Sequence, residues 1–331
     1  MRLMPFPRPG RQGVAPHPPR LRVTGPEPER LFDEELLARL RRLVLLSRHS
    51  IAEGLAGEHR SRRRGSSPEF ADFKSYSQGD DYRRIDWNTY ARFGGLFVRL
   101  SEVTTEFDIH ILLDASESMN WTMSPRLPTK FTYARRTAGA LGYVSLWHFD
   151  RLAIAPFGAV LAPRFGPVQG RANAIPMLRY LEGLAPYGAT DLPTVLETYL
   201  RSRRRPGLLV LISDLLSGEP EQIGAQLRKQ RAEGWQTIVV HIVDPAELDP
   251  AALEGGARIG ATELIDVELG DRLRLTPTAA VVERYRTALR GWLAQIEEVC
   301  EREEAEYLRL ETGWPFESIV LRLLHERGVV A

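Results

Sequence analysis

Apolar and polar positions follow two alternating patterns from about residue 105 onward. Short runs that are almost continuously apolar are typical of parallel strands buried on both faces, and the segments between them repeat apolar residues at helical spacing. The expected strands are 107–113, 152–157, 207–213, 237–243 and 262–268, and the expected helices are 130–148, 171–184, 191–204 and 219–233. This alternation predicts an α/β fold, a doubly wound and mostly parallel sheet flanked by helices.

Three other parts flank this region. The start of the chain is rich in proline and arginine and has no continuous apolar core, so we expect a disordered tail there. An amphipathic helix and a small β-rich region with turn signals should follow the tail. A long helix near 278–304 and a shorter one near 315–327 should form a helical extension at the end of the chain. We place the boundaries of the four parts at 1–30, 31–104, 105–275 and 276–331.

The composition is that of an ordinary soluble protein. The 331 residues are 43% hydrophobic and 26% charged, and the net charge of +1 gives no general attraction to nucleic acid or membrane. A single cysteine, Cys300, excludes an intramolecular disulfide framework and fits a reducing compartment. No stretch reaches the roughly 18 to 20 apolar residues of a spanning helix. We therefore expect a cytoplasmic protein.

Oxygen-bearing side chains follow the first expected strand at two-residue intervals. The segment "DASES" places Asp114, Ser116 and Ser118 just past that strand, and alternate residues of an extended loop project to one side. Ligands of such sheets bind beyond the carboxyl ends of the strands, where Asp214 ends another strand and Thr190 lies in a loop before a helix. An all-oxygen set without His or Cys favours Mg²⁺ or Mn²⁺. The sequence thus predicts a metal site whose open position can accept an acidic side chain from a partner.

Other interpretations of these residues remain open. Asp and Ser also favour turns and helix N-caps, so the same string could be purely structural. Asp114 could instead be the nucleophile of a Mg²⁺-dependent phosphohydrolase, although such enzymes commonly have an acid where Ser116 stands. The chain has no G-K-[ST] phosphate loop, G-x-S-x-G elbow, G-x-G-x-x-G loop or H-E-x-x-H helix, and we expect no catalysis.

Two stretches carry a resemblance to known families. "DASES", together with Thr190 and Asp214, resembles the metal-ion-dependent adhesion site of von Willebrand factor A domains. Upstream, "GEHRSRRRGSSPEFADFKSYSQGDDYRRIDWNTYARFGGLFVR" resembles the signature of the bacterial family called domain of unknown function 58 (DUF58). The resemblance implies a von Willebrand factor A-like fold. Because members are often encoded beside MoxR-type AAA+ ATPases, it also implies a metal-dependent adaptor or co-chaperone that works with such an ATPase.

Charged segments before the α/β region suggest further contacts. The segment "HRSRRR" could bind an acidic ligand or nucleic acid, or it could be a solvated turn whose arginines pair with nearby acids. Its candidate binding residues are Arg60, Arg62, Arg63 and Arg64. "QGDDYRRIDW" favours an ion-pair network that locks the N-terminal region onto the α/β domain, with Trp87 buried, over direct catalysis or partner contact. Asp244 before Pro245 favours a helix N-cap.

Overall fold

The computed structural model describes residues 30–43, 70–76, 85, 87–101, 108–122, 124, 126–202, 205–248, 262–265, 272–275 and 278–317. Contacts divide the chain into two compact units, one of residues 1–47 with 108–331 and one of residues 48–107. The expected tail, apart from Arg30, and the basic segment 59–64 lie outside the described residues. None of the helices in the described ranges is long and apolar enough to cross a membrane.

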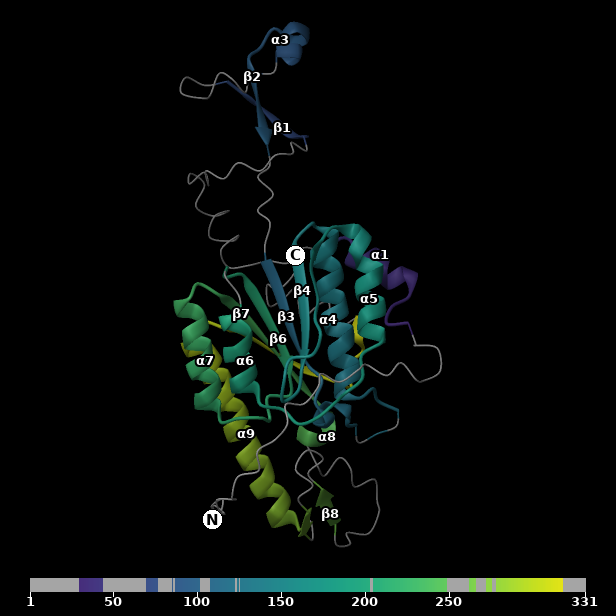
Figure 1. Cartoon of the computed structure of the whole chain (residues 1–331), viewed down its shortest axis with the longest axis vertical. Helices are drawn as coiled ribbons and strands as arrows, with labels where there is room; N and C mark the ends of the chain where they lie inside the picture. The colour runs from purple at the N-terminus through teal and green to yellow at the C-terminus, as the bar shows by residue number, and fades with distance from the viewer. Residues whose placement is uncertain are drawn as a thin grey trace. The chain divides into compact units, whose positions relative to one another are not determined.

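A six-stranded sheet forms the centre of the larger unit (Figure 1). Its strands are β3 (Asp108–Asp114), β4 (Arg151–Phe157), β5 (Phe165–Gln169), β6 (Leu208–Ser213), β7 (Gln236–Val243) and β10 (Glu306–Glu311), in the order β10-β7-β6-β3-β4-β5. All neighbours pair in parallel except β4 and β5, which are antiparallel. Every residue of β6 is buried, as expected for a central strand covered on both faces. The sheet confirms the predicted α/β fold.

Helices cover both faces of this sheet. The longer ones are α4 (Lys130–Trp147), α5 (Ala174–Glu182), α6 (Leu192–Arg201), α7 (Pro220–Ala232) and α9 (Ala279–Arg302). In Figure 1, α4 and α5 lie on one side of the strands, and α6, α7 and α9 lie on the other. The core on the second side packs Leu112 and Val239 of the sheet with Leu196, Leu227 and Ile296 of these helices. This unit also contains the short helices α1 (Glu34–Leu40), η2 (Glu117–Asn120), η3 (Arg171–Asn173) and α8 (Pro245–Leu248).

Three features differ from the expectations. The segment expected as a sheet strand at 262–268 forms β8 (Thr262–Ile265), which pairs with β9 (Arg272–Leu275) in a separate antiparallel hairpin, because its polar residues do not suit a central strand. The C-terminal stretch 276–331 is not purely helical, since β10 extends the main sheet with buried Leu308 and Leu310 and exposed Arg309 between them. Finally, α1 belongs to the larger unit and not to the β-rich region.

The described part of the smaller unit contains a two-stranded antiparallel sheet and one helix. β1 (Phe70–Ser75) pairs with β2 (Phe97–Ser101), and α3 (Trp87–Phe93) lies between them in the chain. Trp87 is 62% exposed and meets the Tyr90 ring edge-on at 6.1 Å, so the expectation that Trp87 is buried is wrong. The charged residues 80–84 lie outside the described residues.

Candidate metal centre

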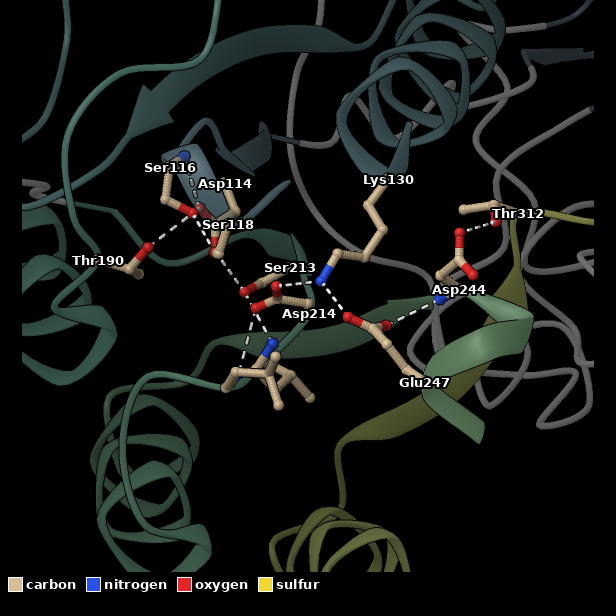
Figure 2. A network of polar contacts seen from close by, with 12 residues as sticks. Asp114, Ser116, Ser118, Lys130, Thr190, Ser213, Asp214, Asp244, Glu247 and Thr312 are labelled. Atoms are coloured by element: carbon tan, nitrogen blue, oxygen red, sulfur yellow. Dashed lines mark hydrogen bonds and ion pairs between the residues drawn. The ribbon is translucent and has the colours of Figure 1, made fainter. Parts of the chain in front are cut away.

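The carboxyl ends of two neighbouring parallel strands bring the predicted residues together. Asp114 is the last residue of β3, and Asp214 directly follows β6. The register pairs Leu113 with Ile212, so the next positions, Asp114 and Ser213, also lie side by side. Figure 2 shows Ser116, Ser118 and Thr190 gathered around Asp114, with Asp214 next to Ser213. The structure thus places all five predicted residues at one edge of the sheet.

Backbone hydrogen bonds fix the segment after β3, in which extended Ser116 precedes the short helix η2. The amide of Ala115 donates to the carbonyl of Phe157 at 2.7 Å, which ties the loop to the end of β4. The carbonyl of Ala115 accepts from the amide of Tyr187 at 2.6 Å, and the amide of Glu117 donates to the carbonyl of Gly188 at 2.9 Å. These two bonds fix the loop that carries Thr190 against the loop that carries the serines. Ser116 and Ser118 come together with their Oγ atoms 3.0 Å apart, but not through the extended loop that the sequence predicts, because Ser118 lies in the 3-10 helix η2.

Asp114 is fully buried and accepts hydrogen bonds at both oxygens. Its Oδ1 accepts from the amide of Ser116 at 3.0 Å and from Ser116 Oγ at 2.7 Å, and Thr190 Oγ1 lies 3.5 Å away. Its Oδ2 accepts from Ser213 Oγ at 2.5 Å. Ser118 Oγ joins the cluster through a 3.0 Å contact with Ser116 Oγ. All these donors are neutral, so they orient the carboxylate without cancelling its charge.

Asp214 has a charged partner instead. Its Oδ2 accepts from Lys130 Nζ at 2.7 Å, and its Oδ1 accepts from the amide of Leu216 at 3.2 Å. Lys130 is the first residue of α4, and its side chain is only 2% exposed. The same ammonium donates to Glu247 Oε1 at 2.6 Å, and Glu247 Oε2 accepts from the amide of Asp244 at 2.9 Å. Figure 2 shows the Lys130 side chain reaching from the start of α4 to a point between the two carboxylates.

The charges of this cluster perturb one another. Burial, followed by repulsion from Asp214, raises the pKa of Asp114 from its ordinary value of 3.8 to about 7, against the hydrogen bonds from Ser213 and Ser116. Burial also acts to lower the pKa of Lys130, but attraction to Asp214 and Glu247 outweighs it and raises that pKa above its ordinary value. Lys130 therefore stays charged, whereas Asp114 is a buried carboxylate that lacks full compensation in the absence of a cation.

The donor set fits a hard cation. Carboxylate and hydroxyl oxygens are ligands that Mg²⁺ and Mn²⁺ accept, and two carboxylates balance a divalent charge. Within the ranges given above, no cluster of three or more His, Cys, Asp or Glu side chains has a metal-binding arrangement. The candidate centre therefore depends on hydroxyls to supplement its two acids. These residues fit a divalent ion in chemical type and in grouping.

Sequence reasoning missed three members of the cluster. Ser213 looks like the last residue of a strand, and Glu247 lies on the four-residue helix α8. Lys130 is one of three lysines in the chain, but nothing in its local sequence shows that it is buried. The expected N-cap at Asp244 is confirmed, since its Oδ1 accepts from the amide of Ala246 at 2.9 Å.

Comparisons with known proteins place the chain among similar sequences and structures. The family model described as "Protein of unknown function DUF58" matches residues 72–292. "Uncharacterized protein Rv1480" from Mycobacterium tuberculosis is 25% identical over 304 residues, which cover 90% of this chain and 92% of the relative. The crystal structure of the conserved hypothetical protein BatB from Bacteroides thetaiotaomicron is similar with a TM-score of 0.38 and 14% identity, over 67% of this chain and 98% of that one. The manganese-loaded TRAP protein of Plasmodium vivax is similar with a TM-score of 0.32 and 18% identity, over 42% of this chain and 57% of that one.

Proposed function

The chain belongs to the DUF58 family, and we propose that it is a protein-binding module whose contact with its partner depends on a divalent cation. The observation that carries this proposal is the oxygen cluster at the carboxyl ends of β3 and β6. There, fully buried Asp114 is surrounded by hydroxyls and lies beside Asp214, so a concentration of negative charge is left without an equal positive charge. A bound cation would remove this penalty.

Five side chains would hold the ion, which we propose to be Mg²⁺ or Mn²⁺. They are Asp114, Ser116, Ser118, Thr190 and Asp214, each directly or through water. When bound, the cation supplies an electrophilic position that can accept a carboxylate from another protein. The protein residues hold the loop geometry, and the backbone bonds between the two loops keep the hydroxyls in place before the ion arrives.

The border of the site suits a protein partner. Leu216, which follows Asp214 by two residues, is 57% exposed, and Val160, in the loop after β4, is 55% exposed. Exposed apolar side chains beside a charged centre are typical of the contact surfaces of proteins. From the family resemblance, we propose a MoxR-type AAA+ ATPase as the partner and a role as adaptor or co-chaperone.

Binding suits this geometry better than catalysis. Ser116 stands where an acid would be needed to protonate a leaving group. We therefore propose that the centre grips a ligand without transforming it. Hydrolysis of a generic phosphoester that is lost in Asp114→Ala would favour the phosphohydrolase alternative.

A co-purification experiment tests the proposal. The tagged chain is mixed with the purified MoxR-type ATPase of the same organism in Mg²⁺ or in EDTA, beside Asp114→Ala and Ser118→Ala in Mg²⁺. Circular dichroism checks that each variant is folded, and Asp33→Asn, at the exposed N-cap of α1, serves as a control for an acid removed elsewhere. We expect capture by the wild type and the control in Mg²⁺, and loss in EDTA and in both site variants. Equal capture in all lanes refutes the proposal.

A further inference from the structure

Lys130 gives the candidate centre a resident positive charge that belongs to the protein itself. Its ammonium contacts Asp214 Oδ2 at 2.7 Å, which is the carboxylate that a metal ion would share with Asp114. The side chain is 2% exposed, so water screens this charge weakly. A divalent cation that binds beside Asp214 therefore meets a second cation on the same carboxylate.

Glu247 offers the ammonium a second anion. Its Oε1 lies 2.6 Å from Lys130 Nζ, on the side away from Asp114 in Figure 2. Glu247 is itself fixed, because its Oε2 accepts from the amide of Asp244 and its backbone carbonyl accepts from Tyr285 Oη at 2.8 Å. Lys130 can thus remain charged and buried when a metal ion binds Asp214, because Glu247 continues to balance the charge of the ammonium.

We propose that Lys130 competes with the divalent cation for Asp214, and that Glu247 retains the lysine's ammonium when the ion binds, so that this pair sets the metal affinity of the centre. The inference rests on the proposed function, because it concerns the same metal. Counting charges gives it a definite form. With Asp114 ionised, the three carboxylates and one ammonium of the cluster carry a net charge of two minus, which matches a divalent ion.

Substitutions that change this charge should change the affinity in opposite directions. Glu247→Gln leaves the cluster with one negative charge, and Asp214 becomes the one carboxylate that still balances Lys130. The affinity for Mg²⁺ should therefore fall about 10- to 100-fold, as it does when other residues that support a metal ligand are replaced. Lys130→Met leaves three negative charges and removes the competing cation, so affinity should rise about tenfold. The double variant restores two negative charges and should bind within about threefold of the wild type.

The test is isothermal titration calorimetry of the full chain with MgCl₂ and with MnCl₂, at pH 8 so that Asp114 is ionised. Two controls repeat the charge changes elsewhere. Glu303→Gln removes a carboxylate that is 2% exposed and paired with Arg228 at 2.7 Å, but it lies just before β10, at the amino end of the strands. Lys229→Met removes an exposed lysine from α7. Both controls should bind the metals as the wild type does.

Each outcome has a separate meaning. If the wild type binds neither metal, the proposed function is wrong. If the wild type binds but Glu247→Gln binds equally well, or if folded Lys130→Met binds more weakly, the competition between Lys130 and the metal is refuted. If Lys130→Met shows no cooperative thermal transition, the double variant Lys130→Met/Glu247→Gln is measured in its place. In that variant, position 247 carries no buried carboxylate that has lost its partner. Affinity in the double variant below that of Glu247→Gln would overturn the inference.

Discussion

Replacing Asp114 with asparagine should make the metal-free protein more stable above pH 7 and remove its response to metal. Asp114 is fully buried, and its pKa is raised to about 7 in the folded chain from an ordinary value of 3.8. The folded chain therefore keeps a proton on this carboxyl group that the unfolded chain has already released. This contribution to stability is complete below pH 3.8 and is lost as the pH rises through 7.

The size of the effect follows from the same two pKa values. A difference of about three pKa units, at about 1.4 kcal/mol for each unit, corresponds to about 4 kcal/mol of unfolding free energy lost between pH 4 and pH 8. Asparagine has nearly the same shape, can still accept from Ser116 and can donate to Ser213, but it carries no charge. Asp114→Asn should therefore lack this loss.

Urea unfolding in EDTA at pH 5, 6, 7 and 8, followed by tryptophan fluorescence, measures the difference. We expect the unfolding free energy of the wild type to fall with pH relative to that of Asp114→Asn, and MgCl₂ at pH 8 to restore it in the wild type alone. Asp33→Asn should behave as the wild type, because Asp33 is an exposed N-cap and asparagine caps equally well. Parallel pH profiles for Asp114→Asn and the wild type would refute the idea that Asp114 holds an uncompensated charge.

Three further changes probe the fold around the centre. Gly158→Ala would place a Cβ 2.7 Å from the carbonyl oxygen of Tyr187, so we expect the loop carrying Thr190 to shift, with weaker Mg²⁺ binding by calorimetry and a loss of about 1–3 kcal/mol in urea unfolding. Leu112→Ala, at a fully buried strand position, should cost about 2–5 kcal/mol of unfolding free energy while the folded protein keeps its Mg²⁺ affinity. Burial lowers the pKa of His241 from 6.5 to about 4, so the stability that its neutral ring contributes is present above pH 6.5 and is lost as the pH falls through 4. In urea unfolding, His241→Gln should therefore lose about 3 kcal/mol less unfolding free energy than the wild type between these two pH values.

The central strands were predictable because their environment is uniform. β3, β4, β6 and β7 are covered on both faces, so nearly every position is apolar and the sequence shows continuous runs. β10 was missed because it is an edge strand, in which buried leucines alternate with polar residues over only six positions. β5 has five residues, none of them buried, and contains Gly166 and Pro167, which favour turns. Incomplete burial thus removed the apolar signal, and length alone did not, because the predicted strand β6 also has six residues.

The residues of the candidate centre also differ in how well the sequence predicts them. Asp114, Ser116 and Ser118 are close in the chain, so their grouping was predictable, although Ser118 lies in η2 and not in the expected extended loop. Asp214 could be added because the ends of parallel strands meet at one edge, and Thr190 because it lies in a loop just before a helix. Lys130 could not, because its partners are 84 and 117 residues away in the chain and a lysine at the start of a helix is ordinarily exposed. Hydrophobic pattern carries no information about a buried ion pair.

The two carboxylates of the centre differ in a way that bears on how a partner would be held. Asp114 receives only neutral donors from Ser116 and Ser213, whereas Asp214 already shares its charge with Lys130. A divalent ion would therefore draw mainly on Asp114 and the hydroxyls around it, and Asp214 would neutralise it only in part. The cluster as a whole matches a divalent charge, but Glu247 contacts Lys130 and not the ion, so the ion's own ligands neutralise it only in part and it attracts a further anion more strongly than a fully balanced ion would. On the proposed function, the ion pair that weakens metal binding would thus strengthen the attraction between the bound metal and the acidic side chain of the partner.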